Sequence, residues 1–89
     1  MQCLSFKIKG HVQGVFYRAA AQKKAEELGL TGFARNEMDG TVFVVACGAP
    51  ESLTVFEEWL WEGSLGSDVT GVIKSPSQLG PFDDFRVIR

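Results

Sequence analysis

The chain has 89 residues, of which 45% are hydrophobic and 22% charged, and this composition predicts one folded domain over residues 1–89 and argues against disorder. The formal net charge of -2 argues against a protein that binds nucleic acid mainly by neutralising phosphates. Two cysteines are too few for a disulfide-rich scaffold and lack the partners of a metal site, so we expect no metal and no other cofactor.

The beginning of the chain predicts a strand followed by a helix. Hydrophobic and polar residues alternate over residues 4–8, which is typical of a strand with one buried face, and we expect Gly10 to end it. Residues 16–28 have the spacing of an amphipathic helix, and Gly29 is suited to its C-terminal cap.

A β-hairpin is predicted next. Residues 30–36 and 41–47 are both expected to form strands, because the Asp39-Gly40 pair between them favours a tight turn. In the second strand, one face carries Val42, Val44 and Ala46, and the other carries Phe43 and Val45.

The second half of the chain predicts one more helix and two more strands. Pro50 is suited to the first turn of a helix, and Gly63 is expected to end it. Residues 68–74 are typical of a strand, residues 75–81 of a loop rich in Ser, Pro and Gly, and residues 85–88 of a short terminal strand.

This order of elements favours an α+β fold of the ferredoxin-like type, βαββαβ. It is a two-layer sandwich, an antiparallel sheet with both helices on one face, here with a short extra C-terminal strand. The first and third strands are then antiparallel neighbours, which brings Cys3 close to Cys47 on the open face of the sheet. A disulfide between them is geometrically possible, but the reducing cytoplasm favours the alternative of two packed thiols.

The loop before the first helix is the strongest candidate for a binding site. Its two glycines, Gly10 and Gly14, allow successive backbone N–H groups to face one point, and the helix start adds unpaired donors, so the loop is suited to a phosphate. Arg18 lies in the first helical turn and can reach the same anion. The alternative is an ordinary turn with an exposed Arg.

Charge is distributed unevenly along the chain, in a way that suits an anion near this loop. Residues 1–36 contain six basic and two acidic residues, whereas residues 37–89 contain three basic and nine acidic residues. The loop nevertheless lacks the spacing and the Lys of a Walker motif, and no cysteine precedes an Arg at the spacing of thiol phosphatases.

Two runs of residues carry a resemblance to a known family. The first reads Gly10-His11-Val12-Gln13-Gly14-Val15-Phe16-Tyr17-Arg18, and the second reads Gly32-Phe33-Ala34-Arg35-Asn36, followed by Asp39-Gly40-Thr41-Val42 and Gly48. In this order they resemble the two signatures of the acylphosphatases. The similarity extends over nearly the whole chain and includes Trp59-Leu60 and Phe85-Arg86-Val87-Ile88. Tyr17 is a small departure, because the family more often has Phe there.

The resemblance implies a hydrolase that cleaves small acyl phosphates to a carboxylate and inorganic phosphate without a metal. It implies that Arg18 and the backbone amides of the loop bind the phosphoryl group, and that Asn36 orients the attacking water. The loop residues concerned are Gln13, Gly14, Val15, Phe16, Tyr17 and Arg18. By its sequence alone, Asn36 has an alternative role, since Asn before a hairpin frequently serves the turn.

The alternative function is a binding module of the same fold, for either an anion or RNA. RNA recognition favours several aromatic residues on the open face of a sheet, and we expect only Phe43 there. The expected partners are therefore the acyl phosphate and inorganic phosphate, as product or inhibitor, and neither nucleic acid nor a membrane. No stretch has the features of a signal peptide or a membrane span, so we expect a cytoplasmic protein. We also expect it to be a monomer.

Overall fold

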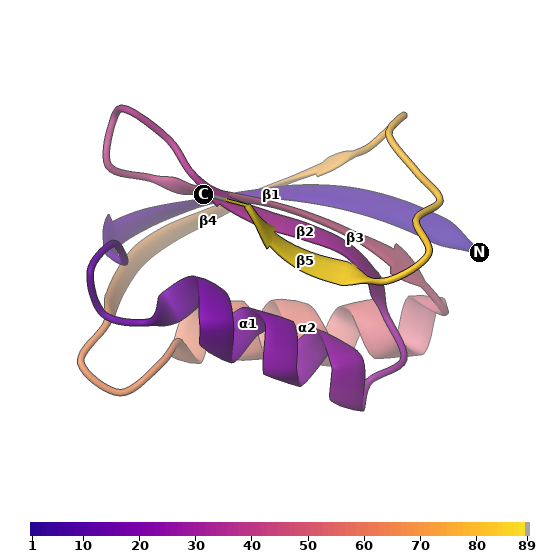
Figure 1. Ribbon diagram of the computed structural model, residues 1–89, viewed down its shortest axis with the longest axis horizontal. Helices are drawn as coiled ribbons and strands as arrows, with labels where there is room; N and C mark the ends of the chain where they lie inside the picture. Colours follow the sequence, from indigo (N-terminus) through magenta and orange to yellow (C-terminus); the bar gives the residue numbers. More distant parts are fainter. Residues whose placement is uncertain (89) are drawn as a thin grey trace.

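A computed structural model describes residues 1–88 of the chain. They form one sheet with two helices packed on one of its faces, which confirms the predicted ferredoxin-like α+β sandwich (Figure 1). The elements are β1 (Gln2–His11), α1 (Tyr17–Glu27), β2 (Thr31–Asn36), β3 (Val42–Gly48), α2 (Pro50–Glu62), β4 (Asp68–Pro76) and β5 (Phe85–Ile88). Neither helix combines the length and the apolar character that crossing a membrane requires.

The strands of the sheet follow the order β4-β1-β3-β2-β5. As predicted, β1 and β3 are antiparallel neighbours; Cys3 pairs with Cys47 at one end, and Ile8 pairs with Val42 at the other. The extra strand β5 differs from the other described strands because it pairs with its neighbour, β2, in parallel. It therefore ends beside the C-terminal end of β2.

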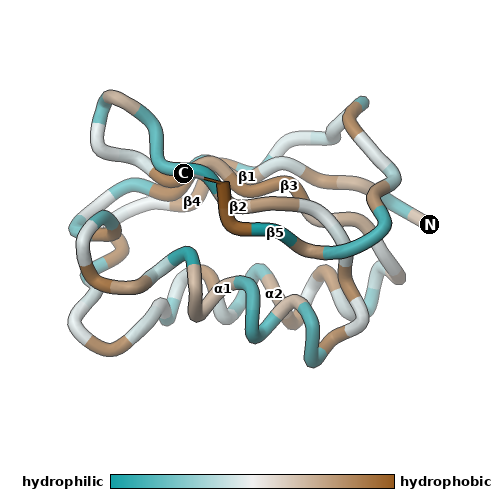
Figure 2. The backbone as a smooth tube through the Cα atoms, viewed as in Figure 1, coloured by the Kyte–Doolittle hydropathy of each residue, from teal (hydrophilic) through white to brown (hydrophobic). Residues whose placement is uncertain are grey.

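The hydrophobic core lies between the sheet and the helices. Phe6 and Ile8 of β1 are fully buried and face Leu53, Phe56 and Leu60 of α2, which are also buried. In Figure 2 the central strands are largely hydrophobic, whereas both helices alternate between hydrophobic and hydrophilic residues. Burying one large apolar side chain stabilises a fold by about 1.5–3 kcal/mol, so this interface accounts for the arrangement of the two layers.

The pairing of β1 with β4 extends beyond the predicted strands at both of its ends. β1 continues past Gly10 through a bulge to His11, and Gly10 adopts a φ of 123° there. A side chain at Gly10 would collide with the backbone of Asp68, so this glycine permits the close pairing and does not end the strand. At the other end, Leu4 pairs with Pro76, within the segment that we expected to be a loop.

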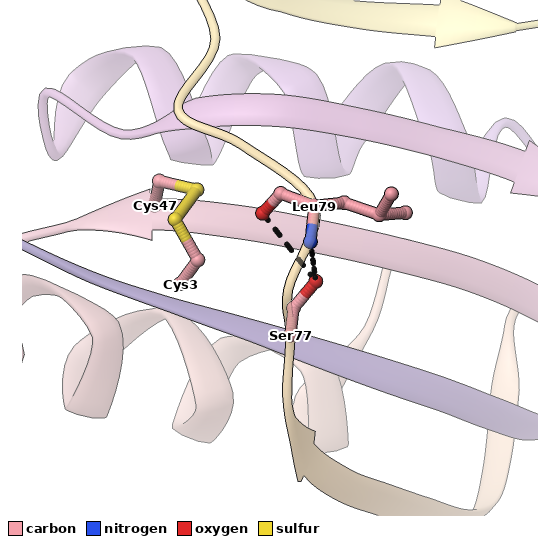
Figure 3. Close-up of a disulfide and its surroundings, with 4 residues drawn as sticks. All are labelled: Cys3, Cys47, Ser77 and Leu79. Atoms are coloured by element: carbon pink, nitrogen blue, oxygen red, sulfur yellow. Dashed lines mark hydrogen bonds between the residues drawn. A yellow bond between two sulfur atoms is a disulfide. The ribbon is translucent and has the colours of Figure 1, made fainter.

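In the structure, Cys3 and Cys47 form a disulfide and are not the two packed thiols that the cytoplasm would favour. The loop after β4 runs close beside this bond (Figure 3). The Ser77 N–H donates to the Cys3 carbonyl (3.0 Å), and the Leu79 N–H donates to the Ser77 hydroxyl (3.1 Å). A Cβ atom at Gly80 would lie 2.6 Å from the Cys47 sulfur, which shows how closely the loop covers the disulfide.

The open face of the sheet carries more aromatic residues than we expected. Phe33 lies between Phe43 and Phe82, with ring centroids 6.0 and 5.7 Å away, and the Arg35 guanidinium lies over the Phe43 ring. The expectation of Phe43 alone was wrong, because Ala34 takes the core side of β2 and turns Phe33 outward. Phe33 is only 9% exposed, however, and is therefore unavailable for stacking on a nucleobase.

Candidate active site

A surface cavity of about 390 Å³ lies between the loop after β1, the first turn of α1, and the ends of β2 and β5. This volume is within the range of small-molecule sites, about 300–1,000 Å³. The residues that line it come from segments far apart in the sequence: Val12, Gly14, Phe16, Tyr17, Arg18, Ala19, Asn36 and Val87. The structure thus brings Arg18 and Asn36, the two residues expected to be catalytic, to one cavity.

The loop before α1 has unpaired backbone donors, and its residues Gly14 and Phe16 line the cavity. Gly14 and Phe16 both adopt left-handed conformations, with φ of 76° and 59°. Within residues 1–88, the N–H groups of residues 13–16 have no hydrogen-bond acceptor. The N–H groups of Tyr17 and Arg18 belong to the first turn of α1 and have no partner in the helix. The positive end of the helix dipole and these amides together favour an anion.

Arg18 is held in place by the last strand of the sheet. Its Nη1 donates to the carbonyl of Ile88 in β5 at 2.7 Å. A guanidinium has five N–H donors, so this contact orients the group and leaves others available for a bidentate contact with an anion. β5, the strand added to the βαββαβ plan, therefore helps to build the cavity.

Asn36 is the last residue of β2, and its side-chain oxygen has no partner. Oδ1 is buried and accepts no hydrogen bond within residues 1–88. The hairpin turn is instead stabilised by Asp39, whose carboxylate accepts from the Thr41 hydroxyl (2.6 Å) and the Thr41 N–H (3.1 Å). The Asn36 oxygen therefore makes no hydrogen bond in the turn. An unpaired buried polar atom costs about 1–3 kcal/mol, so its place beside the cavity calls for a functional explanation.

The same turn contains Asp39, a carboxylate whose pKa is lowered. The two hydrogen bonds from Thr41, together with the Lys7 ammonium 3.3 Å away, lower the pKa of Asp39 from 3.8 to about 2. Its side chain is largely exposed, so this carboxylate stabilises the turn and is not part of the cavity.

Gln13 and Val15, which we expected to contribute amides, do not line the cavity. The side chain of Gln13 reaches the hairpin, where Nε2 donates to the carbonyls of Glu37 (2.8 Å) and Thr41 (2.9 Å). The carbonyl of Val15 accepts from the Ser64 hydroxyl at 3.1 Å. Gln13 thus ties the loop that carries the amides to the hairpin that begins at Asn36, a role that no local sequence pattern indicates.

Comparison with known proteins decides the family. The Acylphosphatase family model matches residues 4–87. The chain belongs to the acylphosphatase family. An acylphosphatase of Xanthomonas oryzae pv. oryzae is 45% identical over 85 residues, which cover 96% of this chain and 97% of that protein.

Solved acylphosphatases share the whole fold. The structure of an acylphosphatase from Coxiella burnetii matches with a TM-score of 0.93 at 42% identity, over 98% of this chain and 92% of that one. That of the Bacillus subtilis acylphosphatase matches with a TM-score of 0.95 at 31% identity, over the full length of both. This chain is therefore an enzyme, an acylphosphatase, and it hydrolyses acyl phosphates.

In this acylphosphatase, Tyr17 has a buried role that explains the departure from Phe. Its ring is 1% exposed and packs against Trp59, with centroids 5.5 Å apart, and its hydroxyl donates to the Leu60 carbonyl at 2.7 Å. Burial raises the pKa of the phenol, so the group stays neutral. The bond pairs one of the carbonyls that a helix leaves open at its C-terminus. Tyr17 thereby fixes the start of α1 against α2.

Sequence reasoning missed the apolar part of the acylphosphatase cavity. Val12, Ala19 and Val87 line it together with Phe16, and only their convergence in three dimensions shows this. Among residues 1–88, no cluster of three or more His, Cys, Asp or Glu side chains has a geometry suited to a metal ion.

Proposed function

We propose that this acylphosphatase hydrolyses the carboxyl-phosphate bond of small acyl phosphates without a metal. Arg18 and the backbone amides of Gly14 and residues 16–18, which line the cavity, bind the phosphoryl group, and Asn36 orients the attacking water. The observation that carries this proposal is that Arg18, Asn36 and residues of the loop before α1 line the same cavity.

The phosphoryl group is bound by groups that need no metal. A guanidinium and several N–H donors at a helix N-terminus complement the charge on the equatorial oxygens, in the ground state and more strongly in the transition state. These donors are positioned in advance: the Ile88 carbonyl orients Arg18, and Gln13 ties the loop to the hairpin. Little reorganisation is then needed when the substrate binds.

The chemical step is an in-line displacement at phosphorus. The oxygen of water forms a bond to phosphorus while the bond from phosphorus to the acyl oxygen breaks, and the products are a carboxylate and inorganic phosphate. The proton of the water passes to a phosphate oxygen of the substrate. Because a carboxylate is a good leaving group, no strong general acid is required. An amide can both accept from and donate to a water, so the unpaired Asn36 Oδ1 supports its role.

The cavity is suited to a small molecule. Inorganic phosphate, a product of the reaction, is expected to inhibit the enzyme by binding to the same donors. We propose further that the enzyme is a cytoplasmic monomer. A disulfide is uncommon in the cytoplasm, but the loop over Cys3 and Cys47 limits the access of reducing thiols to the bond.

The test is hydrolysis of benzoyl phosphate by the wild type, Arg18→Ala and Asn36→Ala, with and without a chelator. Each variant should lose at least about a hundredfold in kcat/KM, and the chelator should have no effect. Arg86→Ala is a matched control, since Arg86 is exposed and pairs only with Asp84 among the described residues. Wild-type rates in both variants would overturn the residue assignment. Phosphate binding without any hydrolysis would favour the anion-binding module.

A further inference from the structure

Phe16 is an unusual residue at the mouth of the cavity. It lines the cavity, and it is 85% exposed. It is also the N-cap residue of α1, and its backbone is left-handed (φ 59°, ψ 24°). Among residues 1–88, no other residue except glycine has a positive φ. Phe16 thus has an aromatic side chain that is exposed to solvent and a backbone conformation that residues with bulky side chains rarely adopt.

The shape of the loop explains the backbone of Phe16 but not its ring. The left-handed turn directs the neighbouring amides, and a glycine would adopt this conformation without steric cost. The ring contributes little to the core, because most of it is in contact with solvent. A strained residue with an exposed apolar side chain beside a binding site indicates a function for that side chain.

The cavity has a polar and an apolar part. Arg18 and Asn36 supply its polar groups, whereas Phe16, Ala19 and Val87 supply apolar surface. A bound acyl phosphate has the same two parts. When its phosphoryl group lies against Arg18 and the amides, the remaining, apolar lining is available to its acyl group.

We propose that Phe16 is a specificity-determining residue that forms, with Ala19 and Val87, a subsite for the acyl group of the substrate. The subsite selects acyl phosphates with a flat or bulky apolar acyl group, such as an aryl group, over those with a small one. This inference rests on the proposed function of the cavity. The ring of Phe16 packs against the acyl group and covers it from water, which favours both its binding and the alignment of the scissile bond.

The test compares kcat/KM for benzoyl phosphate with kcat/KM for acetyl phosphate in the wild type, Phe16→Leu and Phe16→Gly. The wild type should prefer benzoyl phosphate, and Phe16→Gly should reduce this preference by about tenfold, as expected for the loss of one aromatic contact. Phe16→Leu should retain an intermediate preference. Because the two substrates share the same phosphoryl group, an effect of the substitution on the Phe16 amide lowers both values of kcat/KM and cancels from their ratio.

Two further readouts separate this role from a structural one. Phe16→Gly should unfold at the same or a higher temperature than the wild type, because glycine relieves the left-handed strain. Leu65→Ala removes another exposed apolar side chain, 101% exposed and in the loop after α2, and should leave the preference unchanged.

The outcomes distinguish the two proposals. An unchanged benzoyl-to-acetyl ratio in Phe16→Gly, or no preference in the wild type, would overturn the acyl-group subsite while leaving the proposed mechanism intact. Wild-type enzyme that binds phosphate but hydrolyses neither substrate would overturn both.

Discussion

The two ends of the β1–β3 ladder are built for different purposes. At one end, Cys3 and Cys47 are joined covalently, and the loop after β4 packs over the bond. At the other end, beyond the pair Ile8 and Val42, the chain holds open amides, left-handed residues and the unpaired oxygen of Asn36. The first end increases the stability of the fold, and the second decreases it.

A small domain has a limited core, so this difference has a physical reason. Groups that must bind a substrate have to remain unpaired in the empty enzyme, and each unpaired group costs stability. A disulfide at the opposite end offsets that cost without occupying the site. The comparison predicts that the two ends can be changed separately.

The largest effect on stability is expected from the disulfide. The bond joins residues 44 positions apart, and removing such a cross-link lowers the free energy of unfolding by about 2–4 kcal/mol. The double variant Cys3→Ala, Cys47→Ala should show this loss in urea unfolding, while its kcat/KM at 25 °C stays within about twofold of the wild type. A large loss of activity in the folded variant would show that the two ends are coupled.

Gln13 provides a test at the cavity end, because its side chain holds the loop against the hairpin and does not bind the substrate. Gln13→Met keeps the length of the side chain and removes both bonds to the hairpin, so the amides and Asn36 lose their fixed spacing. We expect kcat for benzoyl phosphate to fall by about tenfold to a hundredfold, with a smaller change in KM.

Gln22→Met is the matched control for this prediction. Gln22 also donates from its side chain to one backbone carbonyl, that of Phe85 at 3.0 Å, but it lies outside the cavity. Equal losses of activity in Gln13→Met and Gln22→Met would assign the effect to general stability.

The smallest effect is expected from Asp39, which lies in the hairpin next to the cavity. Its pKa is lowered from 3.8 to about 2, so its ionised form is favoured by folding. Its contribution to stability should be complete above pH 3.8 and lost as the pH falls to about 2. In urea unfolding, wild type and Asp39→Asn should therefore differ at pH 6 and converge towards pH 2. A constant difference over this range would contradict the prediction.

The elements and the site motif could be predicted from the sequence, but the contacts that support the site could not. Alternating residues in β1 and the helical spacing of α1 follow from local periodicity, and Arg18 and Asn36 lie in runs that resemble family signatures. Strand ends were less predictable, because the continuation of β1 past Gly10 depends on the backbone of Asp68.

The sequence by itself determined the order of strands and helices, the family, and the residues that carry the proposed chemistry, because these depend on local patterns and on motifs read along the chain. Only the tertiary structure decided three other features: the orientation of Arg18 by β5, the link from Gln13 to the hairpin, and the apolar lining around Phe16. Each of these joins segments that are distant in sequence. Such contacts form only when packing has set the position of every element, so no local pattern encodes them.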